Sequence, residues 1–244
     1  MSVRSGITAE GLKKRYGRLE ALSECTFEAA PGSIVALVGP NGAGKTTALK
    51  LLVGLLAPTA GDAWICGHHV QREPLEAKRV LGFLPDQPFL YEALTISETL
   101  SFIGSMYGLD RRTLRERGNA LLRMVDLAER LHSRVSELSY GMKSRLSIVT
   151  ALLHEPRALI MDEPFFGLDP KTLRLMRQVM RERAAAGTAI LLSTHQLSVV
   201  EDLADRVIIL SRGRIVTVDS VDGLRRAHGA GSLEDIFVRL TDVS

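Results

Sequence analysis

Residues 39–46 constrain the fold more than any other part of the chain. They read GPNGAGKT and lie between the apolar run SIVALV and a stretch with the apolar face of a helix. The spacing G-x-x-x-x-G-K-[ST] between a strand and a helix predicts a loop whose backbone N–H groups surround a phosphate. A glycine-rich turn that merely joins strand to helix is the alternative, and the context disfavours it. A nucleoside triphosphate is therefore expected to bind at Gly39, Pro40, Asn41, Gly42, Ala43, Gly44, Lys45, Thr46 and Thr47.

The side chains of this loop and of a later strand carry the expected chemistry. Lys45 should bridge the β- and γ-phosphates, and the Thr46 hydroxyl should ligate Mg²⁺. The run ALIMDEP ends an apolar strand in two acids. Asp162 is expected to hold the Mg²⁺ water shell, and Glu163 to polarise the attacking water as a general base. Two acids that merely open a surface loop are the alternative, but beside a phosphate loop the pair predicts hydrolysis.

A third strand, LLSTH, ends in His195. A lone histidine at a strand end is usually structural. Here its strand is expected to lie beside the acid-bearing strand, which would bring His195 to the γ-phosphate.

The order of apolar runs predicts the fold class. The first thirty residues have the pattern of β-strands. Residues 95–131 have helical spacing, with Thr95 and Glu98 as a capping-box signature, and a second helix is expected after ELSYG, up to about His154. RALIMDEP, TAILLSTH and RVIILS resemble buried parallel strands, and IILSRGRIVTVD is expected to form a hairpin around Arg212 and Gly213. We expect an α/β fold of the P-loop NTPase type, with a mostly parallel sheet core, an N-terminal antiparallel β subdomain and an inserted α-helical subdomain. Within one domain, 1–244, the ATP-binding core with the β subdomain should span 1–87 and 156–215, the helical subdomain 88–155, and a C-terminal tail 216–244.

Composition limits the partners and the compartment. The 244 residues carry 31 Lys and Arg against 28 Asp and Glu, mixed along the chain, which does not favour a nucleic-acid partner. Cys25 and Cys66 lie in strand-like surroundings and are expected to be buried free thiols in a reducing compartment. There is no leader-like N-terminus and no apolar run near the roughly 20 residues that a membrane span needs. A soluble, cytoplasmic chain is expected.

The motifs GPNGAGKTT, LSYGM, LIMDEP, GLD and STH occur in this order and closely resemble the nucleotide-binding subunits of ATP-binding cassette (ABC) transporters. The resemblance extends from about Ile7 to Leu210. It implies that Tyr16 stacks on adenine, and that LSYGM corresponds to the family signature, usually LSGGQ, with Ser139 and Gly141 retained. It also implies that Asp169 lies in the loop that spans a dimer seam.

The resemblance also implies the partners. In the family two such subunits, here two copies or one copy and a paralogue, pair head to tail, so that each signature covers the ATP of the other. A membrane permease would dock against the helical insertion, about residues 88–135, and hold the chain at the inner face of the membrane. The runs YGMK and SLEDIFVRLT resemble the exporter branch with separate permeases. The cargo would be selected by the permease.

The chain departs from the family pattern at three places that matter. Met142 and the following KSR replace the Gln and the common QR of the family. Asp86 stands where the family has a Gln; it could still ligate Mg²⁺ or orient water, but it is shorter by one methylene and anionic. Tyr140 replaces the first glycine of the signature, which removes backbone freedom and adds a surface for stacking.

Two other classes of function are weighed against a transporter subunit. Cassette ATPases that act on ribosomes or DNA usually fuse two cassettes or carry long coiled coils, and neither pattern occurs here. A P-loop kinase or other transferase would leave the LSYGM stretch unexplained.

Overall fold

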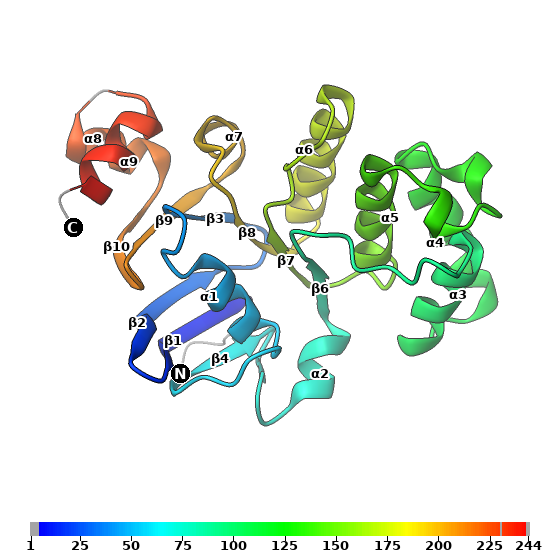
Figure 1. Ribbon diagram of the computed structural model, residues 1–244, viewed down its shortest axis with the longest axis horizontal. Coiled ribbons are helices and arrows are strands. Elements are labelled where there is room, and N and C mark those ends of the chain that lie inside the picture. The colour runs from blue at the N-terminus through cyan, green and yellow to red at the C-terminus, as the bar shows by residue number, and fades with distance from the viewer. Residues whose placement is uncertain (1–4, 230, 243–244) are drawn as a thin grey trace.

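Within residues 5–229 and 231–242, which the computed structural model describes, six strands form the central sheet (Figure 1). All of its pairings are parallel except the last, between β9 and β10. The sequence prediction of a mostly parallel core is thus confirmed. In sheet order the strands are β10 (Arg214–Asp219), β9 (Arg206–Ser211), β3 (Ile34–Val38), β8 (Ala189–Ser193), β7 (Ala158–Asp162) and β6 (Leu81–Leu84).

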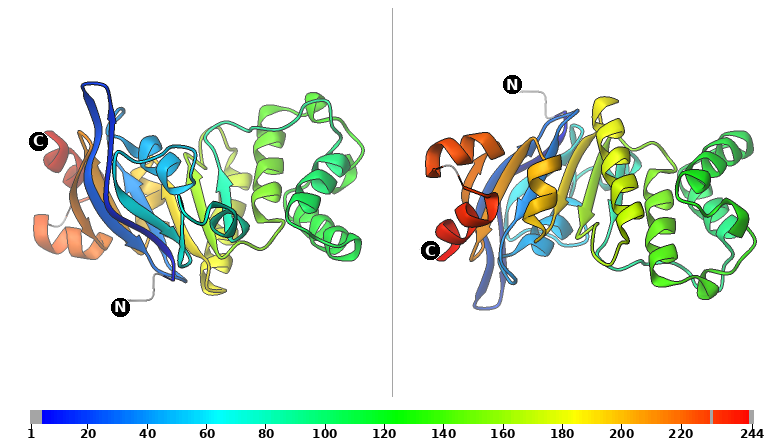
Figure 2. Two further views of the ribbon diagram at one scale, coloured as in Figure 1. Left: turned by 90° about the horizontal axis from the view of Figure 1, so that it is seen from below. Right: turned by 90° about the horizontal axis from the view of Figure 1, so that it is seen from above.

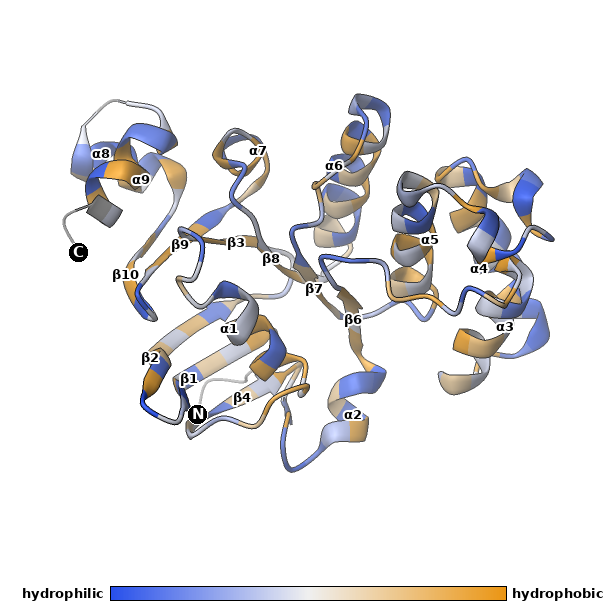
Figure 3. Cartoon of the chain, in the orientation of Figure 1, coloured by the Kyte–Doolittle hydropathy of each residue, from blue (hydrophilic) through white to orange (hydrophobic). Residues whose placement is uncertain are grey.

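The central strands are apolar because both faces of the sheet are covered. Every residue of β3, β7 and β8 is buried, and these strands are hydrophobic along their length (Figure 3). One face packs against helix α1 (Lys45–Leu52) and a second sheet. The second sheet, antiparallel throughout its described pairings, confirms the predicted β subdomain; it contains β2 (Leu19–Ala29), β1 (Ile7–Tyr16), β4 (Ala60–Ile65) and β5 (His68–His69).

The helical insertion forms a lobe at one end of the molecule (Figures 1 and 2). Its first helix begins at the predicted capping box: the Thr95 hydroxyl accepts from the Glu98 N–H, and the Glu98 carboxylate accepts from the Thr95 N–H. The insertion contains α3 (Ile96–Met106), α4 (Arg111–Met124), α5 (Tyr140–Leu152) and short 3₁₀ turns at Ala128–Arg130 and Val135–Glu137.

Five further helices of the described residues, α2 and α6 to α9, lie outside the insertion and the phosphate loop. Asp169 caps α6 by accepting hydrogen bonds from the N–H groups of Lys171 and Thr172, and Pro170 occupies the first helical position. Helices α8 and α9 lie at the end of the molecule opposite the insertion (Figure 2). The expected boundary between residues 215 and 216 falls inside β10. The bounds are α2 (Pro74–Arg79), α6 (Pro170–Ala185), α7 (Leu197–Leu203), α8 (Val221–His228) and α9 (Leu233–Asp242).

Two expectations from composition can be compared with the structure. Cys25 and Cys66 are buried free thiols, as predicted, and burial raises the pKa of both, which keeps them protonated and unreactive. In the described part of the chain, no helix has both the length and the apolar character needed to cross a bilayer.

His154 joins the insertion to the core just beyond the end of α5. Its Nε2 lies 3.0 Å from the carbonyl oxygen of Leu81 in β6, and its ring stacks on Tyr107 with centroids 3.7 Å apart. Burial lowers the pKa of His154 to about 4, although the Leu81 hydrogen bond opposes the change. The imidazole is therefore neutral in the folded chain at neutral pH.

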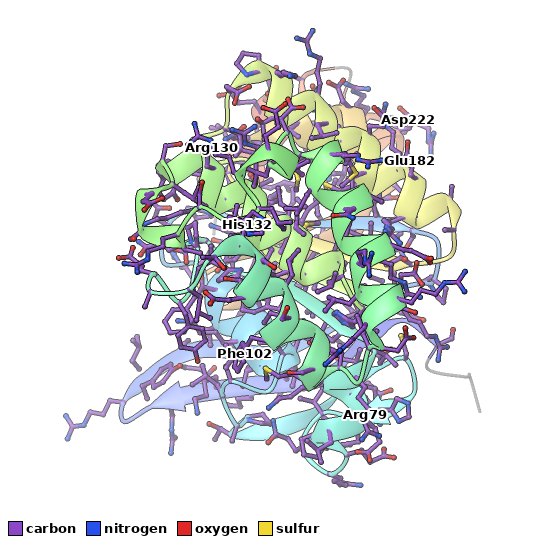
Figure 4. All side chains as sticks on the ribbon, turned by 90° about the vertical axis from the view of Figure 1, so that its right-hand side faces the viewer. Arg79, Phe102, Arg130, His132, Glu182 and Asp222 are labelled. Carbon is purple, nitrogen blue, oxygen red and sulfur yellow. The ribbon has the colours of Figure 1, made fainter. Side chains whose placement is uncertain are left out.

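This burial predicts a loss of stability in weak acid. Between pH 6.5 and 4 the unfolded chain binds a proton at His154 and the folded chain does not, so stability is complete above 6.5 and falls as the pH drops. From pH 7.5 to pH 5 the contribution of His154 to the free energy of unfolding should fall by about 2 kcal/mol. Urea titrations of wild type and His154→Gln at both pH values measure it. His132→Gln, at an exposed position of the same lobe (Figure 4), is the control; an equal acid loss in wild type and His154→Gln would contradict the prediction.

Candidate nucleotide-binding and catalytic site

The site lies at the carboxyl ends of β3, β8 and β7, which are adjacent in the central sheet. Ser193 at the end of β8 pairs with Leu37 of β3 on one side and with Asp162 of β7 on the other. This register confirms that the strand leading to His195 lies beside the acid-bearing strand. Ligands of such sheets bind at the carboxyl edge, where these residues converge.

The phosphate loop has a backbone that requires its glycines. Gly44 has φ of +107°, and a Cβ on it would lie 2.6 Å from the carbonyl oxygen of Ala21; a Cβ on Gly39 would lie 2.3 Å from that of Leu210. The β9–β10 hairpin, at the predicted Arg212–Gly213 turn, supports the loop through the Gly213 N–H, which donates to the Ala43 carbonyl. Because α1 begins at Lys45, the first N–H groups of that helix lie at the loop and are available to an anion.

Lys45 is folded back over its own loop. Its ammonium donates to the carbonyl oxygens of Gly39 at 2.6 Å and of Pro40 at 3.2 Å. Burial lowers the pKa of Lys45, while the nearby charges of Glu163 and Asp162 oppose the change. The lysine therefore stands in reach of the loop's centre, where a bound phosphate could replace the carbonyls as its acceptor.

Asp162 is buried, and the Ser193 hydroxyl donates to one of its carboxylate oxygens. Ser193 was not among the residues predicted from the sequence. The signal for it was a polar residue near the end of an apolar strand, but its role depends on the β7–β8 register. Its hydrogen bond orients the carboxylate and leaves the second oxygen for another partner.

The residues present fit a magnesium ion held jointly with a nucleotide. Thr46 is exposed at the start of α1, and its hydroxyl has no side-chain hydrogen bond in the described part of the chain. Hydroxyl and carboxylate oxygens are ligands that Mg²⁺ prefers, and the ion commonly completes its shell with phosphates and water. Among the described residues no group of three or more His, Cys, Asp or Glu side chains could hold a metal alone. Thr46 and Asp162 therefore suit a metal that arrives with phosphate oxygens.

Glu163 and His195 form a pair at the mouth of the site. The Glu163 Oε2 lies 3.0 Å from the His195 Nδ1 and 3.4 Å from its backbone nitrogen, which donates to it. The Glu163 side chain is 20% exposed and that of His195 is 54% exposed, so the carboxylate can meet water while its position is held. His195 also lines a hollow of about 210 Å³ with Gly39 and Pro40 of the phosphate loop. His195 thus lies beside the phosphate loop, and Glu163 is held against His195.

The signature residues are not part of this site in the same chain. Ser139 caps α5 by accepting from the Met142 N–H, and α5 packs beyond β6, at the far edge of the sheet from β3 (Figure 1). The strands β8 and β7 lie between, so Ser139 and the chain's own phosphate loop are on different parts of the sheet. No described atom outside its immediate neighbours lies within 4 Å of a Cβ built on Gly141, so its surface is open.

Among the described residues, the other candidates Tyr16, Asp86 and Asp169 form no hydrogen bond or ion pair with Lys45 or Asp162. Tyr16 is half-exposed at the end of β1, with the Lys14 ammonium 5.1 Å from its ring centroid. The Asp86 carboxylate accepts from the Gln87 N–H at 2.8 Å. The Asp169 carboxylate caps α6, and the Thr172 hydrogen bonds lower its pKa.

The site combines a phosphate loop, the buried Asp162 at the carboxyl end of β7 and the adjacent Glu163–His195 pair. These features define a P-loop nucleoside triphosphatase. The family model described as "ABC transporter" matches residues 22–166. A model described as an AAA domain, putative AbiEii toxin, matches 132–201 only.

Curated relatives span nearly the whole chain. The linearmycin resistance ATP-binding protein LnrL of Bacillus subtilis is 33% identical over 96% of this chain and 74% of its own length. The Nod factor export ATP-binding protein I of Paraburkholderia xenovorans is 38% identical over 96% of this chain and 77% of its own.

Solved structures of ABC cassettes have the same fold as this chain. An ATP-binding subunit of an ABC transporter superimposes with a TM-score of 0.92 at 37% identity, covering 96% of this chain and 98% of that one. A dimeric bacterial ABC transporter cassette superimposes with a TM-score of 0.80 at 25% identity, covering 88% and 98%. The chain belongs to the ATP-binding subunits of ABC transporters, and it is an ATPase.

Proposed function

We propose that this chain is the ATP-hydrolysing subunit of a multi-component exporter and that it works as a head-to-tail pair. The observation that carries the pairing is the position of the signature. Ser139 is exposed, half-buried Gly141 has open space beside its Cα, and β8 and β7 lie between β6, against which α5 packs, and the chain's own phosphate loop. At about 4.8 Å between neighbouring strands, β3 and β6 are about 14 Å apart. A second copy or a paralogue would bring its own Ser139 and Gly141 to this loop. The dimeric cassette among the similar structures supports this arrangement.

The catalytic roles follow from the geometry of the site. Lys45 would leave its loop carbonyls for the β- and γ-phosphates, and the phosphate-loop N–H groups would hold them. Glu163 would take a proton from the attacking water, with His195 holding the carboxylate and facing the γ-phosphate. Thr46 and Asp162, with Asp86 as a further candidate, would hold Mg²⁺, which offsets phosphate charge when bound. Tyr16 would stack on adenine, and Ser139 of the second subunit would donate to the γ-phosphate.

The assignment to export rests on the names of the relatives and on the C-terminal run SLEDIFVRLT, which resembles the exporter branch. One relative is named for resistance to linearmycin and another for Nod factor export. The cargo would be chosen by a separate permease, which would also place this chain at the cytoplasmic face of the membrane.

We place the permease in a groove between the core and the insertion. The groove shares Ile103, Met106 and Tyr107 with the expected docking region 88–135, and its other walls come from outside that region. The groove has a volume of about 470 Å³, and its walls include Leu55, Leu75 and Met106, each at least 60% exposed. Exposed apolar side chains gathered in one hollow indicate a protein partner. Arg79 of α2 lies below α3 on this end of the molecule (Figure 4).

The charge of the groove defines the segment that fits it. Lys78 and Arg79 line it and have no acidic partner among the described residues, so an acidic side chain on the partner would complement them. A short amphipathic helix with apolar and acidic residues meets this requirement.

Charge reversal in the groove tests the proposal. Lys78→Glu with Arg79→Glu should abolish co-purification with the membrane protein that wild type retains from detergent-solubilised membranes, because acidic groups would then face acidic groups. Its ATPase activity in isolation should change less than about twofold, since surface substitutions away from a site have small effects.

Arg111→Glu with Arg115→Glu is the matched control, on α4 in the same lobe but outside the groove. If the α4 variant loses the membrane protein and the groove variant keeps it, the permease docks elsewhere on the insertion.

A further inference from the structure

Two of the departures from the family pattern, Asp86 and Tyr140, lie in contact. The Tyr140 hydroxyl lies 3.5 Å from the backbone carbonyl oxygen of Asp86, which it faces as donor. These residues are 54 positions apart in the chain. One belongs to the segment that leads from β6 into the insertion, and the other begins α5.

The Tyr140 ring also touches a third segment, the loop after Glu163. A Cβ built on Gly167 would lie 3.3 Å from the Tyr140 Cε1 and 3.8 Å from its Cδ1, so the ring rests against the bare glycine. Gly167 has φ of +68°, a conformation that favours glycine. These contacts border a narrow cleft, whose lining includes Asp86, Tyr140, Glu163 and Phe166.

The side chain of residue 86 cannot make these contacts itself. Its carboxylate accepts from the N–H of the next residue, Gln87, at 2.8 Å and so turns onto its own backbone. The Asp86 segment is therefore linked to α5 through its carbonyl, and the reach across the cleft comes from Tyr140.

The loop that Tyr140 supports starts at Glu163. Glu163 has φ of +47°, an uncommon conformation outside glycine, and its N–H donates to the Ser193 carbonyl at 3.0 Å. Such a backbone holds only where its surroundings determine it. A shift of Gly167, four residues on, would therefore change the direction of the Glu163 carboxylate.

We propose that Tyr140 is a positioning residue for ATP hydrolysis: it joins the start of the signature helix to the Asp86 segment and to the loop after Glu163, supplying the reach that the short Asp86 side chain lacks. The inference rests on the proposed function in one respect. If two subunits pair, α5 contacts the nucleotide bound by the partner, and Tyr140 links this helix to Glu163, the general base of its own chain.

Steady-state kinetics of Tyr140→Ala test the role. We expect kcat to fall about tenfold, within the range by which contacting residues couple, while KM for ATP changes less than about twofold. Tyr140→Phe keeps the ring on Gly167 but lacks the hydroxyl that faces the Asp86 carbonyl, so it should recover only part of the loss. The control is Tyr91→Ala, an exposed tyrosine whose ring contacts Phe102 instead, and its kcat should stay at the wild-type value.

Asp86→Gln tests the link between the two departures. Its side chain is longer and its amide can both donate and accept, so it can cross the gap that Tyr140→Ala leaves. In the Tyr140→Ala background it should restore at least half of the lost kcat, whereas in the Tyr140 background it should restore nothing. A Tyr140→Ala protein with wild-type kcat, or an Asp86→Gln effect that is equal in both backgrounds, would overturn the proposal.

Hydrogen exchange separates this proposal from the proposed function. The amides of residues 165–168 should exchange faster in Tyr140→Ala than in wild type without nucleotide, and unchanged exchange there would refute the contact. That readout needs neither pairing nor a permease. If wild type fails to pair but Tyr140→Ala still speeds exchange, the pairing fails and the Tyr140 contact stands.

Discussion

Replacing Glu163 by glutamine is expected to lower the ATPase rate by roughly 10²–10⁴-fold, the usual loss when a general base is removed. The amide has nearly the shape of the carboxylate, and its oxygen can still accept from the His195 N–H, so the site should keep its geometry. The glutamine amide, unlike the carboxylate, cannot accept a proton from water at neutral pH. ATP binding should persist, because Lys45 and the phosphate loop are unchanged.

The measurement is phosphate release at saturating ATP, beside a nucleotide titration. Glu182→Gln is the matched control, since Glu182 lies exposed on α6 and accepts only from Gln178. Wild-type turnover by Glu163→Gln would remove Glu163 from the catalytic role.

Lys45→Ala should weaken ATP binding by about 2–5 kcal/mol, the usual cost of truncating one partner of a buried hydrogen-bonded charge pair. The phosphates would lose a cation held at the centre of the loop. The chain without nucleotide should lose little stability, because burial of this ammonium is itself unfavourable, as the lowered pKa of Lys45 indicates.

Melting curves with and without ATP separate the two effects, since a ligand stabilises the state it binds. ATP should raise the Tm of wild type and of the control Lys50→Ala, an exposed lysine on the same helix, but not that of Lys45→Ala. An equal ATP-dependent rise in all three proteins would contradict the role of Lys45.

Local motifs allowed much of the fold and of the candidate site to be predicted. The strand–loop–helix around Lys45, the capping box at Thr95 and the adjacency of β7 and β8 depend on short patterns, and the structure confirms them. Contacts between distant segments were not predictable in this way. The Ser193–Asp162 hydrogen bond requires a strand register, and the Tyr140–Asp86 contact requires the orientation of the whole insertion.

The C-terminal region shows the same limit. The hairpin predicted over residues 208–219 is present, since β10 continues to Asp219. The rest of the region 216–244 was predicted only as a tail, yet it contains α8 and α9. Leu233 and Ile236 of α9 are fully buried in the main core. Their apolar spacing is short and follows glycines, so the sequence alone did not indicate which surface they would cover.

The central claim is that a second subunit completes the nucleotide site. The most direct test is the molar mass of Glu163→Gln in solution, first without nucleotide and then with ATP and Mg²⁺. The account predicts a monomer that doubles in mass only with ATP, because the signature residues Ser139 and Gly141 then meet the phosphates of the other chain. A mass that stays at the monomer value while ATP is bound would contradict pairing between two copies of this chain.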